Sequence, residues 1–221
     1  ASDPATKSVI STFSSNQHIT VDVITNETNL GFSKAVNQGL RKGGSPFSLV
    51  LNNDTIFTDD CLKIMIDVAR GVSDIGIVNP ESNTFGVRPG KGETIDDIAR
   101  RLLARKSSYV EFSNCIGFAM LIKREVIQKI GYLDEAFGIA YFEDSDFSMR
   151  AKAAGYRCVK AAGSYVFHHE HRSLDLVGWK EELFRKNKAL YQSRWGKPLR
   201  IFLPLHQAVL RDRETAKKIL A

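Results

Sequence analysis

The feature that most constrains the fold is a regular alternation of strand and helix patterns joined by short connections. Residues 19–24 alternate with period two, while 47–53 and 75–80 are apolar runs of strand length, the last ended by a proline. Between them, 32–44 and 59–71 carry apolar residues at helical spacing, and two glycines close the first where a left-handed C-cap is expected. This order predicts an α/β sheet with right-handed crossovers, with the strand over 47–53 covered on both faces.

The rest of the chain continues the pattern. Helices are predicted over 4–13, 94–106, 125–130, 147–156 and 178–196, and strands over 116–124 and 164–173. Thr94 is expected to be the N-cap of its helix. Asp96 and Asp97 in the first turn are favourably placed for the helix dipole. The polar loops over 81–93 and 132–142 are long enough to carry function, and we expect them to set substrate choice.

Composition limits the class of protein. With 221 residues, 43% of them hydrophobic, the chain can bury a sizeable core as one large domain. No apolar run is long enough to span a bilayer, and no signal peptide pattern opens the chain. Three cysteines, widely spaced and odd in number, fit neither a zinc framework nor a disulfide scaffold, so we expect a cytoplasmic location.

Positive charge is concentrated near the C-terminus. Residues 172–221 hold 12 Lys and Arg against five Asp and Glu, so the remainder is close to neutral. Such a segment suits nucleic acid, anionic lipid or a phosphorylated substrate, and it is equally compatible with a solvated helix face. Its aromatic residues recur at helical spacing and indicate packing rather than base stacking. We therefore expect no nucleic-acid partner and a peripheral contact with an anionic membrane surface or a lipid-diphosphate acceptor.

Three polar residues, Asn52, Asn53 and Asp54, end the strand over 47–53. Ligands of α/β sheets bind beyond the carboxyl ends of the strands, which is where these side chains lie. A carboxylate flanked by amides suits a hard divalent cation that takes its other ligands from phosphates and water. The alternative is an ordinary turn, because Asn and Asp are common turn residues.

A second acidic cluster consists of Glu143, Asp144 and Asp146, just before a predicted helix. Asp144 could be the N-cap and Asp146 could pair with Arg150 one turn later, which would make the cluster structural. Three carboxylates in four positions exceed what a cap requires, however. One of them could take a proton from a substrate hydroxyl, with a pKa raised by its neighbours.

Two adjacent histidines, His168 and His169, end the strand predicted over 164–173. Neighbouring residues of a regular strand point to opposite faces, so at most one of them can bind a given metal ion. The spacing is not that of a metalloprotease helix.

Five motifs in order give the chain a resemblance to inverting glycosyltransferase family 2, which has the GT-A fold and includes bacterial rhamnosyltransferases. The motifs, which extend over roughly residues 1–195, are NLGFSKAVNQGL, LVLNNDT, IGFAMLIKREVIQKIGYLDEAF, YFEDSDFSMRAKAAGYRC and SYVFHHEHRS. The resemblance implies a mixed, mostly parallel sheet flanked by helices. It also implies transfer of a sugar from a nucleotide-diphospho-sugar to a glycan or lipid-linked acceptor in the polysaccharide biosynthesis of the cell envelope.

The resemblance also implies roles for single residues. Asp54 would bind Mg²⁺ or Mn²⁺ on the donor diphosphate, with His168 as the second protein ligand and His169 as the alternative. Either Asn52 or Asn53 would lie near the ribose.

The same resemblance assigns the acceptor and donor sides. Asp144 would be the general base, and Glu143 would orient a sugar. Three residues, Asn29, Gly31 and Asn37, would form the nucleotide-proximal wall, and Gly117 would leave room for the sugars.

The expected organisation is a GT-A domain over 1–196 and a basic tail or linker helix over 197–221. The family begins with an apolar strand, and this sequence begins "ASDPAT" without Met, so we expect that first strand to be missing. Two rival functions remain: a catalytically inactive binding or scaffold domain of a larger polysaccharide-assembly protein, and a nucleotidyltransferase. The second is disfavoured because no glycine- and lysine-rich phosphate loop is visible near the N-terminus.

Overall fold

The computed structural model describes residues 6, 8–10, 12, 19–170 and 179–197. Its helices are α2 (Phe32–Lys42), α3 (Cys61–Gly71), α4 (Ile95–Leu102), α5 (Arg124–Ile130), α6 (Glu143–Ala153) and α7 (Lys180–Trp195). Its strands are β1 (Phe47–Leu51), β2 (Thr55–Phe57), β3 (Ile75–Ser82), β4 (Tyr109–Glu111), β5 (Ala119–Lys123) and β6 (Arg157–His168). Three short 3₁₀ helices are η1 (Asn83–Phe85), η2 (Leu103–Arg105) and η3 (Glu135–Phe137).

The strands form one mixed sheet in the order β1-β5-β3-β6-β2, and β4 also pairs with β6. The mixed α/β class is confirmed, but the expectation of mostly parallel pairing is wrong for the described strands. Only β3 and β6 pair in parallel, and the other four pairings are antiparallel. Because β1 and β3 both run antiparallel to β5, β1, β3 and β6 point the same way. Their carboxyl ends therefore meet at one edge, together with the start of β5.

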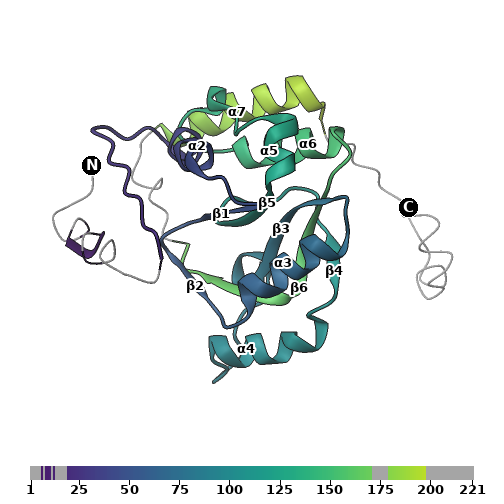
Figure 1. Ribbon diagram of the computed structural model, residues 1–221. Coiled ribbons are helices and arrows are strands. Elements are labelled where there is room, and N and C mark those ends of the chain that lie inside the picture. The colour runs from purple at the N-terminus through teal and green to yellow at the C-terminus, as the bar shows by residue number, and fades with distance from the viewer. Residues whose placement is uncertain (1–5, 7, 11, 13–18, 171–178, 198–221) are drawn as a thin grey trace.

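Helices cover both faces of the sheet (Figure 1). On one face, α2, α5 and α6 pack against a core that includes Ile77, Met120 and Phe147, all of them fully buried. On the other face α3 packs through Met65 on Val78, and α4 lies against the end of β6. In the described ranges, no helix is both long and apolar enough to cross a membrane.

Several expectations about single elements are wrong. Residues 19–24 form no strand, and Ile19, Val23 and Ile24 are about half exposed, because no described strand pairs with this segment. β1 is an edge strand of the described sheet rather than a covered central one. Pro80 lies inside β3, where the register with β6 shifts, and does not end the strand.

Other local expectations are confirmed or corrected by the backbone. Thr94 caps α4 in a capping box with Asp97. Gly43, by contrast, ends α2 in an extended conformation, not a left-handed one. Half of the predicted helix over 4–13 lies outside the described residues, and its described residues, 6, 8–10 and 12, are helical. The tail from 198 onward lies entirely outside the described residues.

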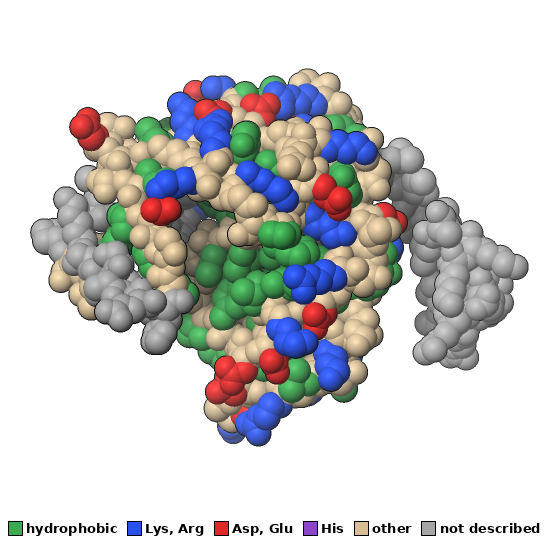
Figure 2. All heavy atoms as spheres, viewed as in Figure 1, with side chains coloured by type: hydrophobic (Ala, Val, Ile, Leu, Met, Phe, Trp, Pro, Cys, Tyr) green, Lys and Arg blue, Asp and Glu red, His purple; other side chains and the backbone are tan. Residues whose placement is uncertain are grey.

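A hollow lined by hydrophobic side chains opens in the middle of the face shown in Figure 2, between the ribbons of β1, β2 and α3 in Figure 1. Large apolar side chains on the adjacent elements are exposed, among them Leu51 of β1, Ile56 of β2 and Leu62 of α3. Lys, Arg, Asp and Glu side chains frame the hollow on this face.

A close backbone approach at Gly163 gives a test of the fold. A Cβ at this position of β6 would lie against the backbone of Lys106 and Arg105, which cannot yield as a flexible side chain would. We expect Gly163→Ala to lower the free energy of unfolding by about 1–3 kcal/mol in urea denaturation. Gly44→Ala, where the added Cβ would meet nothing within 4 Å, is the matched control. Equal stability of the two variants would contradict the packing of β6 on η2.

Candidate functional site

Polar residues from four segments gather at the edge where β1, β3 and β6 end and β5 begins. Asp54 follows β1, η1 follows β3, and His168 is the last residue of β6. Gly117 precedes β5 and contacts Asp144 at the start of α6. The strand ends thus bring Asp54, η1 and His168 to the same edge of the sheet.

The pairing of β2 with β6 brings Asp54 to His168. Thr55 is the register partner of His168, and the backbone N–H of His169 donates to the carbonyl of Asp54 at 2.9 Å. Asp54 Oδ1 consequently lies 3.2 Å from His168 Nε2, and both side chains are largely buried.

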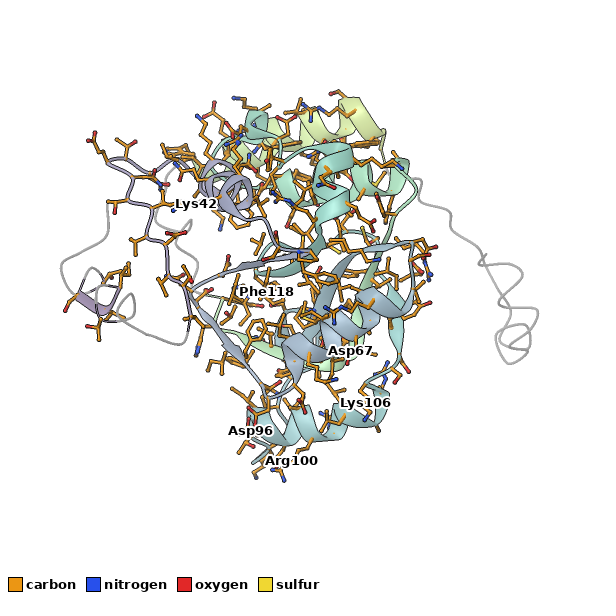
Figure 3. The ribbon with its side chains drawn as sticks, in the orientation of Figure 1. Lys42, Asp67, Asp96, Arg100, Lys106 and Phe118 are labelled. Carbon is orange, nitrogen blue, oxygen red and sulfur yellow. The ribbon has the colours of Figure 1, made fainter. Side chains whose placement is uncertain are left out.

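The orientation of the His168 ring is fixed by its neighbours. Its Nδ1 lies 3.2 Å from the hydroxyl of Thr84, and its face stacks on Phe118 with ring centroids 4.7 Å apart. Figure 3 places Phe118 in the middle of the molecule. The tautomer protonated on Nδ1 would donate to Thr84 and leave the lone pair of Nε2 facing Asp54, as binding of one cation by both side chains requires.

The backbone of His168 is held as well. Asn83 accepts from the His168 N–H at 2.8 Å and donates to the His168 carbonyl at 2.7 Å. In contrast, the ring of His169 packs edge-on against Phe167. This geometry favours His168 over His169 as the partner of Asp54.

The donor set fits a hard divalent cation. Two ligands at about 2.1 Å from one octahedral ion lie about 3.0 Å apart, close to the separation of Asp54 Oδ1 and His168 Nε2. Within the described ranges, no three or more His, Cys, Asp or Glu side chains cluster as a metal site. A cation held here would therefore take its remaining ligands from phosphate oxygens and water, as Mg²⁺ commonly does.

The carboxylates of α6 form the second half of the site. Asp144 Oδ2 accepts from the Gly117 N–H at 3.2 Å, and Oδ1 accepts from the Ser145 N–H at 2.6 Å. Burial raises the pKa of Asp144, against these hydrogen bonds. Burial, followed by the charge of Asp144, raises the pKa of Glu143 to about 7. Glu143 Oε2 is buried and has no hydrogen-bond partner among the described residues.

The third carboxylate, Asp146, is structural. It is fully buried and accepts hydrogen bonds from Arg150, Arg194 and the Trp195 indole at 2.8–3.1 Å. The predicted pairing with Arg150 is confirmed. The predicted N-cap role of Asp144 is wrong, because Phe142 is the N-cap and Asp144 lies in the first turn of α6.

One buried amide connects the two halves. Asn79 of β3 accepts from the Ile116 N–H at 3.0 Å and donates to the carbonyls of Ile116 and Ala119 at 2.8 and 2.6 Å. It thereby fixes the two residues between them, Gly117 and Phe118. One binds Asp144 and the other stacks on His168.

Of four other predicted residues, Asn52 and Asn53 follow β1 at this edge, and Asn29 and Gly31 lie at the entry to α2. The Asn52 N–H donates to the Phe118 carbonyl at 2.8 Å, and the Asn53 side chain is exposed. Exposed Asn29 accepts from the Gly31 N–H and so forms the turn into α2. Gly31 has φ +78, and a Cβ there would lie 2.5 Å from Ile139, so glycine is required for this close approach.

Two predicted residues have a different surrounding from the one expected. Asn37 is buried, and its amide is bound to the backbone of Leu133 and to Glu135, so no donor remains for a nucleotide. The space above Gly117 is filled by the ring of Phe32, 2.5 Å from where a Cβ would be. Gly117 is therefore needed for packing and for its N–H, and in this structure it leaves no room for a sugar.

Few sequence signals point to the residues that support the site. Asn79 could have been singled out as a polar side chain within an apolar strand run, whereas Thr84 lies in an ordinary polar loop. A cavity of about 700 Å³ between α3 and residues 103–109 lies apart from the site, and no predicted site residue lines it. Figure 3 labels Asp67 and Lys106, which belong to its lining.

Comparison with known proteins gives a family match. The family model described as Glycosyl transferase family 2 matches residues 1–131, more than half of the chain. No curated protein matches significantly. The acidic cluster and the histidines lie beyond the matched residues.

Solved structures show the fold. A mannosyltransferase from Pyrobaculum calidifontis, PcManGT in complex with GDP-Man and Mn²⁺, is 16% identical with a TM-score of 0.62, over 90% of this chain and 54% of that one. GalNAc-T7 with UDP, GalNAc and Mn²⁺ is 16% identical with a TM-score of 0.66, over 88% and 40%. S. aureus TarS in complex with UDP-GlcNAc is 14% identical with a TM-score of 0.58, over 99% and 60%. The chain has an α/β GT-A fold and spans less than two thirds of each of these proteins.

The raised pKa of Glu143 predicts a stability that falls with pH. The folded protein holds this proton up to about pH 7, whereas the unfolded chain releases it near pH 4.5, so stability is lost across that interval. Glu143→Gln removes the free-energy cost of ionising this buried carboxyl. We expect its free energy of unfolding, relative to wild type, to rise by about 2 kcal/mol between pH 5 and pH 8 in urea denaturation. Glu182→Gln, exposed on α7, is the control. A difference in free energy of unfolding between Glu143→Gln and wild type that does not change with pH would contradict the burial of this carboxyl.

Proposed function

The chain belongs to glycosyl transferase family 2, and on that basis we propose that it transfers a sugar from a nucleotide-diphospho-sugar. The acceptor is a glycan or a lipid-linked sugar, and the transfer inverts the anomeric carbon with the help of Mg²⁺ or Mn²⁺. The observation that carries the proposal is the approach of Asp54 to His168, which Phe118 and its neighbour Gly117 link to the carboxylate of Asp144.

Asp54 and His168 would hold the cation. Once bound, the cation neutralises charge that grows on the diphosphate leaving group. Thr84 keeps Nε2 of His168 available by occupying Nδ1. The Mn²⁺ in the names of the PcManGT and GalNAc-T7 complexes agrees with this choice of metal.

Asp144 would act as the general base. Its carboxylate is oriented by the N–H groups of Gly117 and Ser145, and its raised pKa makes it a stronger base than an exposed aspartate. It takes the proton of the acceptor hydroxyl as that oxygen attacks the anomeric carbon from the face opposite the diphosphate. A single displacement inverts the centre. Glu143, with its unpartnered Oε2, would orient a sugar hydroxyl.

The pathway is a separate part of the proposal. The proposed pathway is polysaccharide biosynthesis at the cell envelope, and the proposed subtype is bacterial rhamnosyltransferase-like, both on the support of the sequence motifs. The basic tail that would contact a membrane or a lipid-diphosphate lies outside the described residues. An inactive binding or scaffold domain is the alternative, and it would bind a donor without turnover.

Turnover by wild type separates a transferase from an inactive binding domain, and turnover by Asp144→Asn tests the role of Asp144 as the base. We expect wild type with Mn²⁺ to release nucleoside diphosphate from at least one of a panel of UDP-, GDP- and TDP-sugars. Asp144→Asn should lower kcat by about 10²–10⁴-fold, because the base is lost, while donor KM stays within a few-fold. Asp96→Asn, exposed in the first turn of α4, makes the same change in another helix and is the control.

Two outcomes would contradict the assignment. Loss of donor affinity with turnover retained would exclude Asp144 as the base. Donor binding by wild type with no release from any sugar nucleotide would favour the inactive domain.

A further inference from the structure

The turn that leads into the two carboxylates has an unusual backbone. Tyr141 and Phe142 both have positive φ, 74° and 72°, although neither is glycine. A non-glycine residue in this conformation is strained and persists only where its surroundings enforce it. The Phe142 carbonyl accepts from the Asp146 N–H at 2.8 Å and so begins α6. The strained turn therefore decides where Glu143 and Asp144, the first two residues of α6, are placed.

Asn187 of α7 holds this turn from behind. Its side chain is fully buried, and Nδ2 donates to the carbonyls of Phe137, Ala140 and Tyr141 at 2.6, 2.7 and 3.2 Å. Its own Oδ1 is buried with no hydrogen-bond partner in the described part of the chain. A buried acceptor without a partner destabilises the fold, so the stabilising contribution of this side chain comes from the hydrogen bonds that Nδ2 donates.

Side chains on both sides of Asn187 contact the same region. Phe184 lies 5.3 Å from the ring of Phe142, and Tyr191 lies 5.4 Å from it, measured between ring centroids. One turn further along α7, Arg194 and Trp195 donate to fully buried Asp146. α7 is thus fastened to the chain on both sides of Glu143 and Asp144.

We propose that Asn187 is a positioning residue, which holds the turn at Tyr141 and Phe142 so that Glu143 and Asp144 stay at the reactive edge of the sheet. This role rests on the function proposed above, in which Asp144 is the base. It makes α7, beyond the residues matched by the family model, part of the catalytic unit.

The test compares Asn187→Ala, Asn187→Ser, which keeps one donor, and Lys188→Ala, an exposed neighbour on α7, as the control. The first measurement is the carboxyl ¹³C NMR titration of Glu143, assigned with Glu143→Gln, and it requires no substrate. On α6 the charged neighbours of Glu143 are Asp144 and Asp146, and Arg194 faces them from α7. The second measurement is kcat and KM for release of nucleoside diphosphate.

In wild type and Lys188→Ala the Glu143 titration should have its midpoint at about pH 7. In Asn187→Ala it should move down by about one pH unit or more, because a released turn exposes the carboxyl to water, and Asn187→Ser should lie between. kcat should fall about 10- to 100-fold with donor KM little changed, since β2 and β6, not α7, hold Asp54 and His168.

A lower melting temperature with an unchanged Glu143 midpoint in Asn187→Ala would overturn the proposal and leave Asn187 a structural residue. Should the alanine variant fail to fold, the midpoint of Asn187→Ser decides in the same way. Absence of turnover in wild type would count against the proposed function, while the NMR titration would still decide whether Asn187 holds the turn.

Discussion

The site depends on the amide of Asn79. Its three hydrogen bonds to Ile116 and Ala119 fix the two residues between them, and each of these touches a different half of the site. Gly117 gives its N–H to the carboxylate of Asp144, and Phe118 provides the ring on which His168 lies. The groups proposed to bind the metal and to accept the proton come from segments far apart in the chain, and the hydrogen bonds of Asn79 hold the segment that contacts both.

Holding that arrangement costs stability. Glu143 is buried and Asp144 is partly buried beside it, the pKa values of both carboxyls are raised, and a strained turn precedes them. A buried carboxyl that must ionise, or a left-handed non-glycine residue, destabilises the fold by itself. Such features are retained where the chemistry needs them, and here they coincide with the residues that the sequence motifs single out. The neighbouring Asp146, neutralised by two arginines, lacks the unpartnered oxygen that Glu143 has.

The sequence predicted what is local and missed what depends on distant partners. Helices α2, α3 and α4 follow from apolar spacing, and α4 also from its Thr94 cap. The polar residues Asp54 and His168 at strand ends follow from the change from apolar to polar residues there. The strand expected over 19–24 fails because a period-two pattern becomes a strand only beside a partner, and none is described there. Asn37 looked like a ligand-binding residue, yet its partners at Leu133 and Glu135 lie almost 100 positions away. Asn187 sits in a charged helix where no local signal separates it from its neighbours.

The central claim is that Asp54 and His168 form a metal-dependent nucleotide site. Calorimetric titration of UDP, GDP and TDP with and without Mn²⁺ tests it most directly, on wild type, Asp54→Ala, His168→Ala and His169→Ala. We expect one nucleotide to bind only with Mn²⁺, and to bind about 10–100-fold more weakly or not at all to the first two variants. His169→Ala should bind like wild type, because the His169 ring packs on Phe167. Nucleotide binding that needs neither Mn²⁺ nor Asp54, or no binding of any nucleotide by wild type, would contradict the account.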